Sequence, residues 1–179
     1  AMTSSLVGSE MCIRDRNMDM VDTIAVYHDV GHSIDAKNHE KVSASILASD
    51  KNLREFFSEK EIRVMAEAVE DHRASKDSEP RSIYGRIVSS ADRNTSVNQV
   101  LRRTYSYRLK HMPDASIDEI IENSRKHVID KFGTKGYAID KIYFPDDEYE
   151  SFLAGIQELA GDPEEFRRRY IEVNEINFS

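Results

Sequence analysis

Apolar residues recur at steps of three and four along most of the chain, and this spacing constrains the fold more than any other feature. Residues at such steps share one face of a helix with 3.6 residues per turn, so the pattern predicts amphipathic helices. The expected helices cover residues 18–28, 37–48, 58–72, 80 to beyond 101, 116–132, and a final helix from 162. Ser58 with Glu61, and Ser116 with Glu119, have the spacing of capping boxes. The sequence therefore predicts an all-α fold, in which residues 134–145 are the one candidate for an extended segment.

Length, charge and cysteine content narrow the class of protein. A chain of 179 residues has room for one domain. The single Cys12 excludes an internal disulfide framework and a multi-cysteine zinc site. A net charge of −8 argues against a general nucleic-acid binder, and no apolar run approaches the roughly 18 residues of a membrane span. We therefore expect a cytoplasmic protein whose partners include neither nucleic acid nor a membrane.

Residues 1–17 (AMTSSLVGSEMCIRDRN) stand apart from the rest of the chain. They show no helical or strand period, and their apolar residues never form the apolar region of a signal peptide. The string SSLVGSEMCIRDR resembles a translated adapter sequence, so we expect a non-native or disordered leader and a natural protein that begins earlier. The single domain then occupies residues 18–179, with a core at 18–110 and a C-terminal helical extension at 111–179.

Histidine and aspartate residues recur on four of the expected helices. The residues are His28, Asp29, His39, His72 and Asp92. The apolar spacing places His72 on a buried face and Asp92 at the edge of an apolar stripe, where an unpaired carboxylate would be costly. Helical bundles build metal sites from imidazole and carboxylate ligands that converge from several helices, and this set suits a transition metal better than calcium. The pattern predicts a metal site formed by all five residues.

Each of these residues also has a plainer structural interpretation. His28 could bond to a loop carboxylate, Asp92 could cap a helix or pair with an arginine, His39 could lie on the surface, and His72 could be a satisfied core histidine. The charged residues around His111 and His127 predict solvated side chains, and Arg102 and Arg103 are expected to form exposed ion pairs.

The strings VYHDVGH, KNHEKVSASIL, AVEDHRAS and IVSSADR, in that order, resemble the HD-domain superfamily of metal-dependent phosphohydrolases, and most closely its small stand-alone bacterial members. The resemblance implies an HD-domain helical bundle with additional C-terminal helices. In that family an upstream histidine, a His-Asp pair and a later aspartate bind the catalytic metal, and the last three match His28, Asp29 and Asp92. Two further histidines in some members match His39 and His72, and these bind a second metal or the substrate phosphate.

The resemblance implies hydrolysis of a nucleotide or another small phosphorylated metabolite by a metal-activated water, with Mn, Fe, Mg, Co, Ni or Zn as the divalent cofactor. Asp29 and His72 are the candidate catalytic residues. The candidate substrate-binding residues are Lys37, His39, Arg73 and Arg93. Cations among these residues would neutralise charge that develops on the phosphoryl group.

One departure from the family pattern leaves two other interpretations open. No histidine precedes His28, so the ligand set is one short. The chain could then be a nucleotide-binding or sensing HD module with weak or no turnover. It could also be a helical interaction protein in which the histidines are incidental. Apolar surface left uncovered by a missing helix would favour a homo-oligomer.

Overall fold

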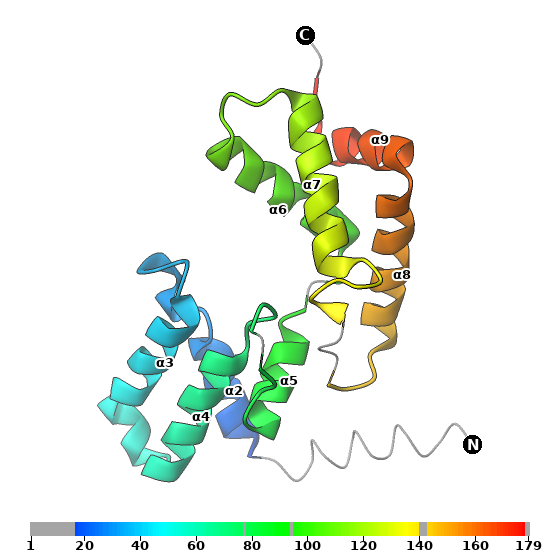
Figure 1. Cartoon of the computed structure of the whole chain (residues 1–179). Helices are drawn as coiled ribbons and strands as arrows, with labels where there is room; N and C mark the ends of the chain where they lie inside the picture. The colour runs from blue at the N-terminus through cyan, green and yellow to red at the C-terminus, as the bar shows by residue number, and fades with distance from the viewer. Residues whose placement is uncertain (1–16, 77, 94, 140–142, 178–179) are drawn as a thin grey trace, which may run out of the picture. The chain divides into compact units, whose positions relative to one another are not determined.

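The computed structural model describes residues 17–76, 78–93, 95–139 and 143–177. These residues form eight α-helices and two short 3₁₀ helices, with no strand among them (Figure 1). The prediction of an all-α fold is therefore confirmed. None of the described helices combines the length and hydropathy that a membrane span requires. Residues 1–16 of the expected leader lie outside the described residues.

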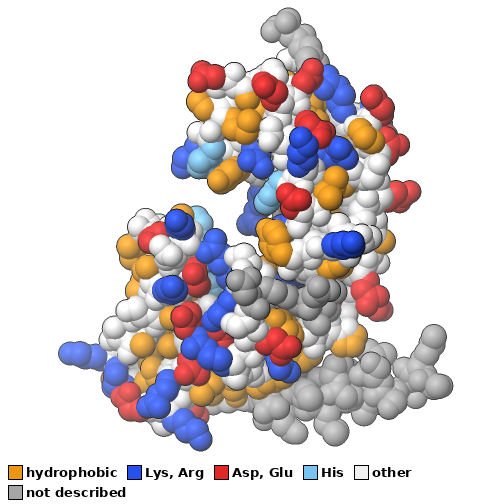
Figure 2. All heavy atoms as spheres, in the orientation of Figure 1, with side chains coloured by type: hydrophobic (Ala, Val, Ile, Leu, Met, Phe, Trp, Pro, Cys, Tyr) orange, Lys and Arg blue, Asp and Glu red, His pale blue; other side chains and the backbone are white. Residues whose placement is uncertain are grey.

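The chain divides into two compact units, and the first comprises residues 1–92 with 141–145. Its elements are α2 (Met18–Tyr27), η1 (Val30–Ser33), α3 (His39–Ser49), η2 (Lys51–Glu55), α4 (Glu59–Asp71) and α5 (Ile83–Ala91). Helix α4 packs against α2, α3 and α5, so it lies at the centre of the unit. The buried core consists of Met20, Ile24, Leu47, Ile62, Met65, Ala68, Val69 and Val88. On the face in view, acidic and basic side chains are interspersed over this unit (Figure 2).

The second unit comprises residues 93–140 and 146–179. Its helices are α6 (Val97–His111), α7 (Ile117–Phe132), α8 (Asp147–Gly161) and α9 (Pro163–Asn174). The buried hydroxyl of Tyr170 on α9 lies 2.8 Å from Ser124 Oγ on α7. The two units divide after Asp92, ahead of α6. The core expected from the sequence ends at residue 110, which lies within α6, and this helix packs against α7 and α9.

Both expected capping boxes are present. In α4, the Ser58 hydroxyl accepts a hydrogen bond from the Glu61 amide at 3.3 Å, and Glu61 Oε2 accepts from the Ser58 amide at 2.8 Å. Ser116 and Glu119 form the same pair of bonds at the start of α7. Two short side chains therefore fix where these helices begin.

The expected single helix from residue 80 to beyond 101 is wrong. Helix α5 ends at Ala91, and α6 begins after Ser96, whose hydroxyl accepts from the Gln99 amide at 3.4 Å. This cap starts a new helix at Val97. The expected extended segment is also absent, since no described residue of 134–145 forms a strand, and residues 140–142 lie outside the described residues.

Gly31 allows η1 to approach α3 closely. A Cβ atom at this position would lie 2.7 Å from the Ser43 amide nitrogen and 2.8 Å from the His39 carbonyl oxygen. The Gly31 amide donates to Ser43 Oγ at 2.9 Å. This contact brings the turn that follows Asp29 to the start of α3, where His39 lies.

We expect Gly31→Ala to lower the free energy of unfolding by about 1–3 kcal/mol, because the added methyl overpacks this contact. Gly155→Ala in α8 is the matched control, since a Cβ there meets no atom within 4 Å. Alanine is also the better helix former by about 0.8–1 kcal/mol, so this variant should be at least as stable as the wild type. Urea unfolding followed by circular dichroism measures both changes. An unaltered stability of Gly31→Ala would contradict the prediction.

Candidate metal centre

Three histidines of the first unit are oriented by the same local hydrogen bond. In each, Nδ1 lies close to the backbone carbonyl oxygen three residues earlier. The pairs are His28 with Ala25 at 2.6 Å, His39 with Ala36 at 3.2 Å, and His72 with Val69 at 2.6 Å. A carbonyl oxygen only accepts hydrogen bonds, so Nδ1 carries the proton and a neutral ring keeps its lone pair on Nε2. The fold therefore selects the tautomer that ligates metals through Nε2.

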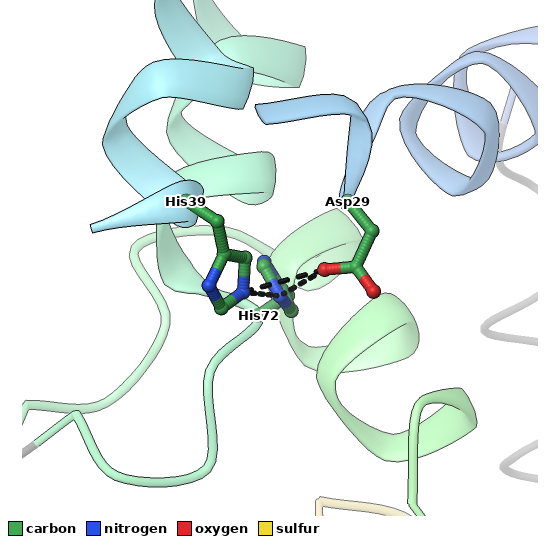
Figure 3. Close-up of side chains that lie close together, drawn as sticks. All are labelled: Asp29, His39 and His72. Carbon is green, nitrogen blue, oxygen red and sulfur yellow. Dashed lines mark hydrogen bonds and ion pairs between the residues drawn. The ribbon is translucent and has the colours of Figure 1, made fainter. Parts of the chain in front are cut away.

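Two of these nitrogens converge with a carboxylate oxygen. His39 Nε2 lies 3.3 Å from Asp29 Oδ1 and 3.3 Å from His72 Nε2, and His72 Nε2 lies 3.7 Å from Asp29 Oδ1 (Figure 3). Three lone pairs that face one another repel unless a cation lies between them. A point equidistant from three atoms so spaced lies about 2.0 Å from each, within the range of metal–nitrogen and metal–oxygen bonds. Asp29, His39 and His72 therefore fit a divalent metal ion.

His28 lies near the carboxylates of both Asp29 and Asp92. His28 Nε2 is 3.7 Å from Asp29 Oδ2 and 3.8 Å from Asp92 Oδ1. His28 follows the C-terminal end of α2, and Asp92 follows the C-terminal end of α5. Asp29 thus contacts His39 and His72 through one oxygen and His28 through the other, and Asp92 joins these residues through His28.

The site combines a buried base with solvent-facing carboxylates. The side chain of His72 is 2% exposed, whereas those of Asp29 and Asp92 are 54% and 48% exposed. Burial lowers the pKa of His72 below its ordinary value, although the Val69 carbonyl and the charge of Asp92 act in the opposite direction. The ring is therefore neutral at neutral pH, as a metal ligand must be. The exposed carboxylates leave the site open to a small molecule.

The candidate substrate-binding cations lie in different surroundings. Arg73 Nη1 donates to the Lys37 carbonyl oxygen at 2.6 Å and to Glu40 Oε2 at 3.2 Å. These bonds tie the segment after α4 to the segment before His39. The Lys37 side chain is exposed and forms no ion pair within the described part of the chain. Arg93 is the first residue of the second unit, and there its charge opposes the rise that burial causes in the pKa of Tyr149.

Asp71 is a supporting residue that the sequence analysis missed. Its side chain is fully buried, and it accepts hydrogen bonds from the Arg81 amide at 2.8 Å, from Arg81 Nε at 3.0 Å, and from the Lys76 ammonium. Burial alone would raise the pKa of Asp71, but the bonds from Arg81 and Lys76 outweigh it and hold the pKa below its usual value. The spacing in the sequence could have indicated this residue, because a carboxylate three residues after the buried Ala68 falls on the same face of the helix. Asp71 anchors the segment that follows α4 and hence the position of the adjacent His72.

Comparison with known proteins agrees with this geometry. The profile of the HD domain family matches residues 3–95, which is just over half of the chain. The chain therefore belongs to the HD domain family, whose wider superfamily consists of metal-dependent phosphohydrolases. The matched range includes all five residues described above, and it begins within the segment set aside as a leader. No curated protein and no solved structure matches the chain.

We expect His39→Ala to weaken the binding of Mn²⁺ or Zn²⁺ by at least about tenfold, because it removes one of three converging donors. His111→Ala is the matched control, since its Nδ1 lies 2.8 Å from the Tyr107 carbonyl on the exposed face of α6. Isothermal titration calorimetry on chelator-treated, dialysed protein measures both affinities. Equal affinities in the two variants would count against the proposed donors.

We expect Asp71→Asn to lower the free energy of unfolding by about 1–3 kcal/mol, because it removes a buried acceptor of several charged bonds while its partners keep access to water. Glu70→Gln, which removes a partly exposed partner of the same Arg81, should change stability by less than about 0.5 kcal/mol. Urea unfolding measures both variants.

The pH dependence of the same variant follows from the lowered pKa of Asp71. Its contribution is complete above the unfolded value of about 4 and is lost as the pH falls through the lower folded value. The stability difference between the wild type and Asp71→Asn should therefore shrink in acid. A difference that stays constant down to about pH 2 would contradict this assignment.

Proposed function

We propose that this protein is a metal-dependent phosphohydrolase that acts on a nucleotide or another small phosphorylated metabolite. The observation that carries the proposal is the convergence of His39 Nε2 and His72 Nε2 on Oδ1 of Asp29, with His28 Nε2 lying 3.7 Å from Asp29 Oδ2 and 3.8 Å from Asp92 Oδ1. Membership of the HD domain family supports metal-dependent phosphate chemistry. The exposure of both carboxylates supports access by a small substrate.

The residues of the metal centre have different roles in this proposal. A divalent cation held by them would lower the pKa of its bound water and polarise a phosphoryl oxygen. His39 and His72 hold their nitrogen donors in place through Nδ1, and the neutral His72 ring favours a ligand over a proton donor. Asp29 is exposed and bears an oxygen on each side, so it is positioned to accept a proton from the attacking water. Nitrogen-rich donors favour Mn, Fe, Co, Ni or Zn over Mg.

Substrate binding in this proposal begins with Lys37. Its ammonium group is exposed on the segment that leads into His39, and a chain of net charge −8 needs local cations to attract an anion. Arg73 already bonds to Glu40, so its first role is to hold the start of α3. Contact between substrate and Arg73, His39 or Arg93 remains part of the proposal.

A second candidate function is nucleotide sensing with weak or no turnover. The observation that favours it is that, among the described residues, Asp29, His39 and His72 bring donor atoms within 4.8 Å of one another, whereas His28 and Asp92 stand outside this group. Sites with few protein donors bind metal more weakly. The chain would then bind a phosphorylated ligand without consuming it.

We expect Asp29→Ala to lower kcat/KM by at least about 100-fold on nucleoside monophosphates with Mn²⁺, because it removes a donor shared by both groups. Asp114→Ala, an exposed position in the second unit, serves as the control and should retain full activity. Release of inorganic phosphate is the measurement. Activity that survives Asp29→Ala would show that the reaction occurs elsewhere. Nucleotide binding without phosphate release by the wild type would instead support sensing.

A further inference from the structure

A cavity lies wholly within the second unit, between α6 and α7. Its volume is about 460 Å³, in the range of small-molecule sites. The charged, titratable and aromatic side chains that line it are Arg103, Tyr107, Arg108, His127, Lys131 and Phe132. The residues from α6 recur at steps of three and four, so they share one face of that helix. On the face in view, basic and histidine side chains gather over α6 and α7 (Figure 2).

Arg103, Arg108 and Lys131 give the cavity positive charge, and none of the described residues that line it carries a carboxylate. The Arg108 Nη2 atom donates to the Asn123 carbonyl, a neutral acceptor, at 3.4 Å. Its Nε atom is buried and has no hydrogen-bond partner within the described ranges. Arg103 forms no ion pair with a described residue either. An anion in the cavity would be attracted by these cations and would offer an acceptor to the buried Arg108 Nε, although the chain as a whole carries a net charge of −8.

His127 adds a titratable group to these cations. The sequence predicted a solvated side chain, but the ring is half-buried in the cavity wall. Burial lowers its pKa, the charges of Lys131 and Arg108 lower it further, and Asp130 acts in the opposite direction. The ring forms no hydrogen bond with a described residue. An anion beside it would favour the protonated ring.

The remaining walls are aromatic and apolar. Lys131 Nζ lies 5.0 Å from the centre of the Phe132 ring, and the Arg108 guanidinium carbon lies 5.6 Å from the centre of the Tyr107 ring. These cation–π contacts hold positive groups next to aromatic surfaces. A ligand that uses the whole cavity therefore carries an anionic group and a ring or other apolar part.

We propose that this cavity binds an organic phosphate, with the phosphate group held by Arg103, Arg108 and Lys131 and the organic part against Tyr107 and Phe132. Planar guanidinium groups match the geometry of phosphate oxygens, and they form charge-assisted hydrogen bonds with them. None of the five residues of the metal centre lines the cavity, so this proposal does not rest on the proposed enzymatic activity.

The test uses the full chain with Asp29→Ala in the presence of EDTA, which removes binding through the metal centre. Adenosine monophosphate is the probe, and calorimetry is the measurement. Arg103→Gln on this background should weaken binding by at least about tenfold, because it removes a charge-assisted bond from an exposed position that can be changed without disturbing the core. Arg102→Gln, the exposed neighbour that does not line the cavity, should change binding by less than about twofold.

A second readout is the His127 ring signal in NMR titrations. Adenosine monophosphate should raise the pKa of His127, because the bound phosphate favours the protonated ring. Inorganic phosphate should bind more weakly than adenosine monophosphate, since it lacks a ring to contact Tyr107 and Phe132. Lack of binding at about 10 mM probe, or binding that Arg103→Gln and Lys131→Gln leave unchanged, would overturn the proposal. Equal affinity for the two probes would overturn the role given to the aromatic walls.

Discussion

The hydrogen bond from a histidine Nδ1 to the carbonyl three residues earlier is the interaction on which the metal centre depends. It joins residues only three positions apart, so each ring is oriented by its own segment of the chain. Helix packing then brings the Nε2 atoms to the Asp29 carboxylate. The close contact at Gly31 positions the turn that carries Asp29, and the buried Asp71 positions the end of α4 next to His72.

The sequence predicted those features that depend on neighbouring residues. The capping boxes were found because Ser58 and Glu61 are three residues apart, and the candidate ligands because histidine and aspartate residues recur on four expected helices. The break between α5 and α6 was missed, since the apolar pattern continues across the caps that separate the two helices. Helix α8 was also missed, although its start depends on neighbouring residues: the side chain of Asp146 accepts from the Tyr149 amide at 2.9 Å.

Features that join distant parts of the chain could not be predicted from the sequence. Arg73 was expected to face substrate, but its guanidinium bonds to Glu40, which is 33 positions away. His127 was expected to be solvated because its neighbours in sequence are charged, whereas its surroundings are set by residues of α6. The sequence gives the residue types at such positions, and tertiary packing decides what each side chain contacts.

Asp29 also joins three histidines that come from different segments of the chain. Its two oxygens point to different partners, Oδ1 to His39 and His72 and Oδ2 to His28. Loss of this one carboxylate would therefore remove the shared partner of all three rings at the same time.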